Sequence, residues 1–330
     1  MDTLSTLRPF DPQRAVMEDY GKNFSPPRLA VTDMDKLEAH LERGSIAPDT
    51  RLLTFAVDDV LYTFPMTTVL SYNVIQGQID GSHPWVMTFC NACNTGMVFN
   101  PTLDGRTLHF ERRGAFDGLM LIYDHETESY WQHITGDAFF GASAGRRLDQ
   151  IAPTRHMRAD EALSADANTR VLMHVLTPEQ NKFARAMERM RATPETMNDT
   201  IAATIAVPQE DTRRPRFELG LGIWDEWGSL YVPLLALHNN SNVLTTRQDG
   251  RGLVVYQHED ALAPTAVYAE TTSARWSGDT LKLDNGTSIR RDRLVMSDGT
   301  TTPTGRPMQL LMRWYGFAHT FPGSPILSHV

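Results

Sequence analysis

From Arg51 onward, short apolar runs alternate with turn residues, and this pattern is typical of β-strands joined by tight connections. In the residues before that point, Thr32 to Asp35 can cap a short helix that ends near Gly44. A hairpin turn is predicted at Leu103-Asp104-Gly105. The strand candidates of the first half are 52–57, 60–64, 85–89, 95–99, 107–111 and 119–123.

A helical pattern interrupts the strands between residues 176 and 215. Thr177 followed by Pro178 is typical of a helix start, and apolar residues then recur at helical spacing. The strand pattern returns after Gly220, and Asp284-Asn285-Gly286 predicts another hairpin turn. The strand candidates of this second half are 253–256, 266–270, 280–283 and 294–296.

These patterns predict an α+β, β-rich fold made of two similar, mostly antiparallel β halves joined by a helical connector. Segments 62–70 and 231–237 share the order aromatic residue, proline, apolar residues, and segment 169–175 resembles segment 324–330. The second half is therefore a candidate for a degenerate repeat of the first. The predicted parts are an N-terminal entry segment at 1–50, a cysteine-containing β-rich domain at 51–175, the connector at 176–215 and the second half at 216–330.

Composition narrows the classes of protein. The 330 residues are 41% apolar and 22% charged, so disorder over most of the chain is not expected. A formal net charge of −9 argues against a nucleic-acid partner. No apolar run approaches the roughly 18 residues of a membrane span, and the first residues lack a signal-peptide pattern. We therefore expect a cytoplasmic protein without a membrane partner, for which a small-molecule substrate is compatible and the oligomeric state is open.

The chain contains two cysteines, and both belong to the segment Cys90-Asn-Ala-Cys93 between two strand candidates. A tight turn at the tip of a hairpin can point both sulfurs at one place, and its backbone N–H groups stabilise thiolates. Asn94 can adopt the left-handed conformation that such a turn often needs. In a reducing compartment a permanent disulfide is not expected, so the turn is interpreted as a metal-binding knuckle.

A knuckle supplies only two ligands, whereas structural zinc usually takes four. Soft thiolates also suit copper(I), which accepts two or three ligands. We therefore predict a copper or zinc ion at this turn, completed by one or more histidines, and an incomplete ligand set would leave the open position of a metal-dependent enzyme. The candidate histidines by position are His83, His125, His133 and His238.

Two other interpretations of the cysteines stay open. A Cys-x-x-Cys pair can cycle between dithiol and disulfide as a redox enzyme, although such pairs usually begin a helix, and 95–99 is a strand candidate here. Alternatively the cysteines are inert, and the protein is a binding module that uses the cleft between its halves. Asp124-His125-Glu126 could act as acid or base, but a solvated turn held by Asp124 is the favoured interpretation.

Several segments occur in an order that resembles the prokaryotic domain-of-unknown-function family 3179. They are Phe89-Cys-Asn-Ala-Cys-Asn-Thr-Gly96, Gly105-Arg-Thr-Leu-His-Phe110, Tyr123-Asp-His-Glu-Thr-Glu-Ser-Tyr-Trp131, the glycines at 136, 141 and 145, and the aromatic segment 314–322. The resemblance implies the fold boundaries and the cysteine site, and it implies no reaction.

The chain departs from the family pattern at the candidate site. Asn91 and Asn94 stand where the family has Pro and Gly, and a histidine that the family often carries upstream falls on or near Tyr72 or Asn73. The glutamine that follows the family's tryptophan aligns with His133. This departure makes His133 the preferred third ligand.

Overall fold

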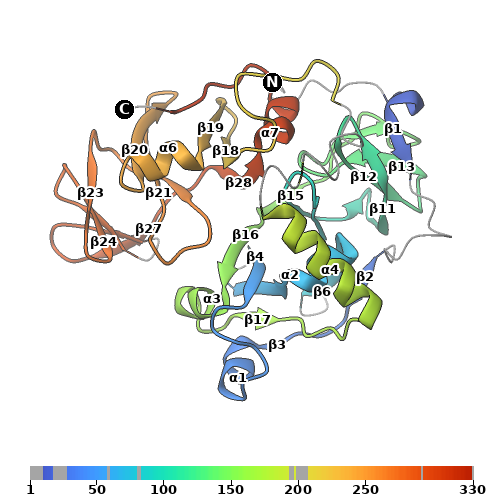
Figure 1. The fold of residues 1–330 in the computed structure, drawn as a ribbon, viewed down its shortest axis with the longest axis horizontal. Coiled ribbons are helices and arrows are strands. Elements are labelled where there is room, and N and C mark those ends of the chain that lie inside the picture. The colour runs from blue at the N-terminus through green and yellow to red at the C-terminus, as the bar shows by residue number, and fades with distance from the viewer. Residues whose placement is uncertain are drawn as a thin grey trace.

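The computed structural model describes residues 10–17, 28–57, 60–79, 83–192, 197, 207–290 and 293–328. Its strands form several sheets with short helices between them, which confirms the predicted β-rich α+β class (Figure 1). The predicted entry segment and helical connector lie partly outside the described residues.

The first sheet has the strand order β16-β4-β5-β17-β3. β4 and β5 form the antiparallel hairpin that the apolar runs predicted, while β17 pairs with β5 in parallel. Its strands are β3 (Asp35–Lys36), β4 (Arg51–Val57), β5 (Val60–Pro65), β16 (Arg155–Arg158) and β17 (Arg170–Val171).

The second sheet carries the cysteines and has the order β15-β8-β7-β6-β2. The Cys-x-x-Cys turn connects β7 to β8, as expected for the tip of a hairpin. Its strands are β2 (Leu29–Val31), β6 (Val74–Ile79), β7 (His83–Thr88), β8 (Met97–Phe99) and β15 (Gln150–Pro153).

The third sheet has the order β1-β11-β12-β13-β14 and supplies the strand that leads to His133. Its strands are β1 (Ala15–Met17), β11 (Phe110–Phe116), β12 (Leu119–Asp124), β13 (Ser129–Gln132) and β14 (Ala138–Phe140). A small hairpin precedes it, formed by β9 (Thr102–Leu103) and β10 (Arg106–Thr107), and its turn places Asp104 and Gly105 at positive φ as the predicted turn requires.

Three sheets follow residue 216. They have the orders β19-β18-β28, β20-β21-β22 and β23-β24-β25-β26-β27. Their strands are β18 (Leu219–Trp224), β19 (Ser229–Pro233), β20 (Val243–Gln248), β21 (Arg251–Tyr256), β22 (Thr265–Tyr268), β23 (Ala274–Ser277), β24 (Thr280–Leu283), β25 (Ser288–Arg290), β26 (Arg293–Val295), β27 (Thr301–Pro303) and β28 (Met308–Arg313).

The helices are short, apart from the one in the predicted connector. They are η1 (Pro12–Arg14), α1 (Leu37–Glu42), α2 (Met66–Tyr72), α3 (Ala159–Ala165), α4 (Pro178–Arg191), α6 (Leu234–Asn239) and α7 (Trp314–Thr320). α4 starts as predicted, because Thr177 and Gln180 form a capping box around its first turn. The predicted cap of α1 is wrong: Lys36 occupies the cap position without a side-chain bond, and 35–36 form β3 instead.

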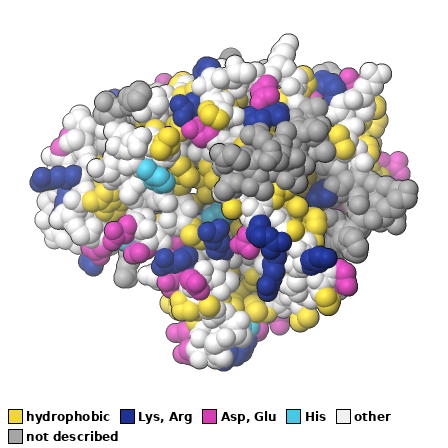
Figure 2. Space-filling view, viewed as in Figure 1, with side chains coloured by type: hydrophobic (Ala, Val, Ile, Leu, Met, Phe, Trp, Pro, Cys, Tyr) yellow, Lys and Arg dark blue, Asp and Glu magenta, His cyan; other side chains and the backbone are white. Residues whose placement is uncertain are grey.

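The largest apolar core surrounds the cysteines and is shared by segments on both sides of α4. Cys90, Cys93 and Trp131 pack in one cluster with Phe217, Trp314 and further aromatic residues of the later segments. β28 and α7 therefore complete the core around a turn that belongs to the first half of the chain. Among the described residues, no helix combines the length and the apolar character that crossing a membrane requires. On the face seen in Figure 2, Lys and Arg side chains are interspersed with Asp and Glu.

Close packing of α7 on β18 gives a testable feature of this shared core. A Cβ atom at Gly222 of β18 would overlap the ring of Phe317 in α7, whereas a Cβ at Gly228 in the following turn meets nothing within 4 Å. We expect Gly222→Ala to lower the free energy of unfolding by about 1–3 kcal/mol through overpacking. Gly228→Ala should leave it nearly unchanged. Urea denaturation of both variants checks this, and equal effects would contradict the packing.

Candidate functional site

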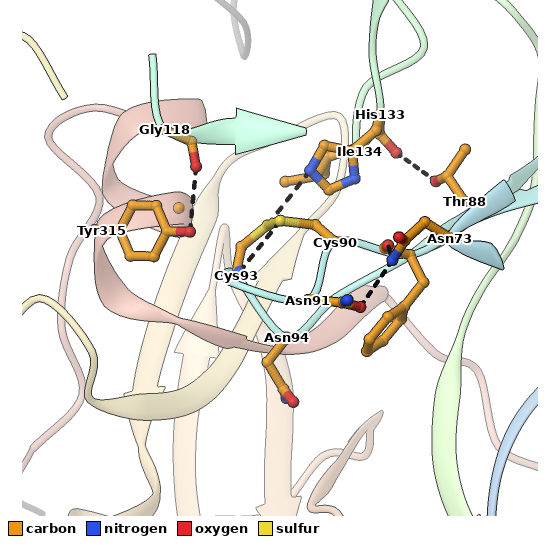
Figure 3. Close-up of a disulfide and its surroundings, with 12 residues drawn as sticks. Asn73, Thr88, Cys90, Asn91, Cys93, Asn94, Gly118, His133, Ile134 and Tyr315 are labelled. Carbon is orange, nitrogen blue, oxygen red and sulfur yellow. Dashed lines mark hydrogen bonds between the residues drawn. A yellow bond between two sulfur atoms is a disulfide. The ribbon is translucent and has the colours of Figure 1, made fainter. Parts of the chain in front are cut away.

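The cysteine turn is held by its own backbone. Cys90 N–H donates to Thr95 O at 2.8 Å, and Asn94 N–H donates to Cys90 O at 2.9 Å. Asn94 has φ 62°, so it takes the left-handed conformation that the sequence predicted. These bonds close a compact turn in which both cysteine side chains lie on the same side (Figure 3).

Cys90 and Cys93 form a disulfide in this structure. The sequence analysis expected no permanent disulfide, and the structure shows the two sulfurs bonded to each other. The physical reason is local, because the turn brings the two Cα atoms to 5.5 Å, which lies within the range that a disulfide spans. Cys93 N–H also donates to Cys90 Sγ at 3.2 Å. Cys90 is 4% exposed and Cys93 is fully buried, so the bond is shielded from solvent.

His133 is the histidine that the fold brings to the sulfurs. It follows β13, and its Nε2 lies 3.5 Å from Cys93 Sγ (Figure 3). The hydroxyl of Thr88, at the end of β7, donates to the carbonyl of His133 at 3.0 Å and ties the loop to the cysteine strand. One ligand atom from each of Cys90, Cys93 and His133 lies within 4.8 Å of the others, and all three residues are buried.

Burial keeps the imidazole of His133 neutral. It lowers the pKa of His133 to about 3, because the charged form would be cut off from water. Nδ1 is buried and has no hydrogen-bond partner among the described residues. The contact of Nε2 with sulfur is weak, since sulfur is a poor hydrogen-bond acceptor. The neutral ring, beside two sulfurs, therefore has a nitrogen that is able to bind a metal ion.

The family-like Tyr-Asp motif builds the scaffold that places His133. Asp124 is fully buried and accepts hydrogen bonds from Thr127 N–H at 2.6 Å and from Trp131 Nε1 at 2.8 Å. Thr127 and Ser129 are bonded to each other across the same turn. The prediction that Asp124 holds the turn through a backbone hydrogen bond is confirmed, but Asp124 is buried and not solvated as expected. By fixing Trp131 in the core, the network orients the chain two residues before His133.

Asn73 is a site residue that sequence reasoning did not single out as functional. It ends α2 in a left-handed conformation with φ 59°, and its Nδ2 donates to Phe89 O at 2.9 Å and to Asn91 Oδ1 at 2.8 Å. Arg112 donates to Asn73 Oδ1 at 2.5 Å. The signal for it was present, because the upstream histidine of the family falls on or near this position.

Two arginines beside the turn were also missed. Arg313 is 1% exposed, and it donates to the carbonyls of Phe217 at 2.6 Å and of Arg191 at 2.9 Å. Arg191 donates to Asn94 Oδ1 and lies over the Phe89 ring. Neither forms an ion pair within the described part of the chain. Desolvation, together with the charge of Arg313, lowers the pKa of Arg191 to about 9.

The other candidate histidines lie elsewhere. His125 pairs with Glu111 at 3.1 Å and is half exposed, and His238 contacts Gln257 at 3.1 Å on the surface. His83 is an exposed residue at the start of β7. The structure therefore brings one of the four candidates, His133, together with the cysteines.

The fold and the site define a β-rich α+β protein that contains a buried Cys-x-x-Cys turn closed by a histidine. The family model described as a protein of unknown function, DUF3179, matches residues 27–318. The chain belongs to this family, as the order of its motifs predicted. Comparison with curated proteins and with solved structures found no match.

The neutral state of His133 predicts a pH effect on stability. An unfolded histidine has a pKa of about 6.5, so between pH 3 and 6.5 the unfolded chain binds the extra proton. The free energy of unfolding should therefore rise with pH across this window. The contribution that comes from the neutral His133 is lost as the pH falls towards 3. In the metal-free disulfide form, His133→Gln should remove a slope of about 1 kcal/mol per pH unit.

Urea denaturation of wild type and His133→Gln at pH 4, 5, 6 and 7 measures this difference. His125→Gln is the matched control, because that histidine is half exposed. Curves for wild type and His133→Gln that run parallel over the whole range would contradict a neutral, buried imidazole.

Proposed function

We propose that the reduced protein binds one copper(I) ion through Cys90 Sγ, Cys93 Sγ and His133 Nε2. Two thiolates and an imidazole form a soft ligand set that suits copper(I), which can be three-coordinate. Zinc would need a fourth ligand. Among the described residues, no further cysteine, histidine or carboxylate side chain joins Cys90, Cys93 and His133 in this group. We therefore rank copper(I) above zinc.

One observation carries the proposal: a fully buried, neutral imidazole with no strong hydrogen-bond partner lies 3.5 Å from a cysteine sulfur. A buried polar group without a partner costs about 1–3 kcal/mol. A metal ion bound to Nε2 would replace the weak contact of that nitrogen with sulfur by a strong bond, while Nδ1 would carry the ring proton. An inert core would more readily place an apolar side chain at this position.

The charge around the turn supports a thiolate complex. Two thiolates with one copper(I) ion carry a net negative charge that is costly to bury alone. Arg191 and Arg313 are the two cations without an ion pair described above; Arg191 donates to the side chain of Asn94, and the backbone N–H of Arg313 donates to the Cys93 carbonyl. Their charge would compensate the negative complex.

The disulfide is then the oxidised, metal-free form of the same site. A thiol reductant supplies two electrons, the S–S bond breaks, and two protons give two thiols. Binding of copper(I) releases these two protons to solvent, because the ligands are thiolates. Metal binding would thus depend on the redox state of the cysteines.

The disulfide itself favours a second candidate, which is a thiol–disulfide redox enzyme. Its Cys90 would be the attacking sulfur, since it is the more exposed of the two. Such an enzyme must bring a substrate to within bonding distance of that sulfur, and 4% exposure leaves little access. A non-catalytic module with inert cysteines remains the third candidate.

We further propose that the chain holds two copies of one unit, of which the first carries the site. Hairpin β4–β5 leads into α2 behind Pro65, and hairpin β18–β19 leads into α6 behind Pro233. β16 pairs with β4, and β28 pairs with β18, on the same side of each hairpin. On the other side, Arg170 pairs in parallel with Tyr62 of β5, and Ile326 pairs in parallel with Tyr231 of β19. By this correspondence the turn between β21 and β22 takes the place of the cysteine turn, and it contains no cysteine.

Anaerobic titration of reduced protein with copper(I), against a competing chelator, tests the copper proposal. We expect one ion per chain for wild type and none for the oxidised protein or for Cys90→Ser/Cys93→Ser. His133→Gln should weaken affinity by more than the about 10–100-fold that loss of an outer-shell partner costs. His125→Gln is the control and should bind as wild type does.

Copper(I) binding by reduced wild type that is no tighter than binding by the double variant would overturn the metal site. In that case, a reversible disulfide with a defined potential would support the redox candidate. If reduction of the disulfide produces neither copper(I) binding nor a defined potential, the cysteines are inert core residues.

A further inference from the structure

A cavity of about 670 Å³ lies between the first and second sheets, away from the residues of the cysteine site. Its walls come from β2 and β6 on one side and from β5 and β17 on the other. Arg28, Arg170, Trp85, Tyr62 and Asp33 are the lining residues that matter for its chemistry. This volume is in the range of pockets that hold small organic ligands.

Two buried donors in this lining lack an acceptor. Arg28 Nη1 and Trp85 Nε1 are both shielded from solvent and have no hydrogen-bond partner in the described part of the chain. Trp85 is 1% exposed, and an indole N–H can only donate. A buried donor without an acceptor destabilises the protein, because it has lost its hydrogen bond to water without gaining another. An oxygen acceptor in the cavity would offset this loss for both donors.

Gly77 of β6 allows the indole to take this position. A Cβ atom there would lie 2.8 Å from Trp85 Cζ2 and 2.9 Å from the carbonyl oxygen of Val31, closer than side chains tolerate. The absence of a side chain therefore lets Trp85 pack against β2 at the cavity wall.

The charges of the lining favour an anion. Arg28 and Arg170 have no ion pair among the residues that the structure describes, while Asp33 is the one carboxylate in the described lining. Another cavity, beside α3, differs in this respect, because its Arg158 is already paired with Asp160 at 2.9 Å and further carboxylates line it. The excess of positive charge and the two hydrogen-bond donors without an acceptor therefore occur in the same cavity.

We propose that this cavity binds a small organic anion with an apolar body. The oxygens of its carboxylate or phosphate group accept hydrogen bonds from Arg28 and Trp85, and Arg170 adds a second positive charge. The apolar body contacts Tyr62 and the aliphatic part of the wall, which includes Val31 and Met34. This proposal is independent of the copper site.

Isothermal titration with three matched probes tests it on the full chain. Benzoate carries a carboxylate, phenyl phosphate carries a phosphate, and benzyl alcohol has the same ring without a charge. We expect at least one of the two anions to bind with a 1:1 stoichiometry and at least tenfold more tightly than benzyl alcohol. The preferred anion identifies the head group.

Variants then assign the binding to this cavity. Arg28→Gln and Trp85→Phe should each weaken binding of the preferred anion at least fivefold, since each removes one donor while Phe keeps most of the apolar volume. Arg275→Gln, an exposed arginine that does not line the cavity, should not change it. A thermal melt of each variant verifies folding, and Arg170→Gln offers a substitution that leaves Trp85 in place.

Three results would overturn the proposal: no binding of either anion, equal binding of benzyl alcohol, or unchanged binding in all three cavity variants. The double variant Cys90→Ser/Cys93→Ser should keep anion binding. The same variant is expected to lose copper binding, so this result would show that the two sites are independent.

Discussion

The buried cysteine turn imposes the constraint on which the rest of the structure depends, because its polar backbone groups must find partners inside the protein. The carbonyl of Cys93 accepts the N–H of Arg313 at 3.0 Å, and the Asn94 amide donates to the carbonyl of Leu311, 217 residues further along the chain, at 3.1 Å. Both partners lie on β28. A tip that would otherwise face solvent is thereby closed by a strand from the other end of the chain, and Gly316 of α7 lets that helix approach Cys93 Cβ.

Because the turn is closed in this way, any reaction at the two sulfurs takes place in the protein interior, away from solvent. Burial keeps His133 neutral and makes its nitrogens available as ligands, while the same burial restricts access for large substrates. This restricted access favours a small ion over a macromolecular redox partner as the occupant of the proposed site.

The second site shares an element with the first. β7 contributes Trp85 to the wall of the cavity between the first and second sheets and leads directly into the cysteine turn, and its Thr88 is hydrogen-bonded to the carbonyl of His133. In both places a buried nitrogen lacks a strong partner, at Trp85 Nε1 in one and at His133 in the other. Unsatisfied buried donors are rare in folded proteins. β7 therefore connects the two regions with which the proposals are concerned, because it contains Trp85 and its Thr88 is hydrogen-bonded to the carbonyl of His133.

The sequence by itself determined the local features. Short apolar runs between turn residues specify β4, β5 and β12, Thr177 with Pro178 specifies the start of α4, and Asn94 specifies a left-handed turn, because each depends on neighbouring residues only. Motif order also determined the family. The departure from the family pattern favoured His133 among the four histidines, and the tertiary structure decided that it reaches the sulfurs. Tertiary structure alone decided that Arg313 and Asn73 adjoin the turn and that Arg28 and Trp85 share a cavity. These residues are far apart in sequence, and their distances are set by sheet packing, which no local pattern encodes.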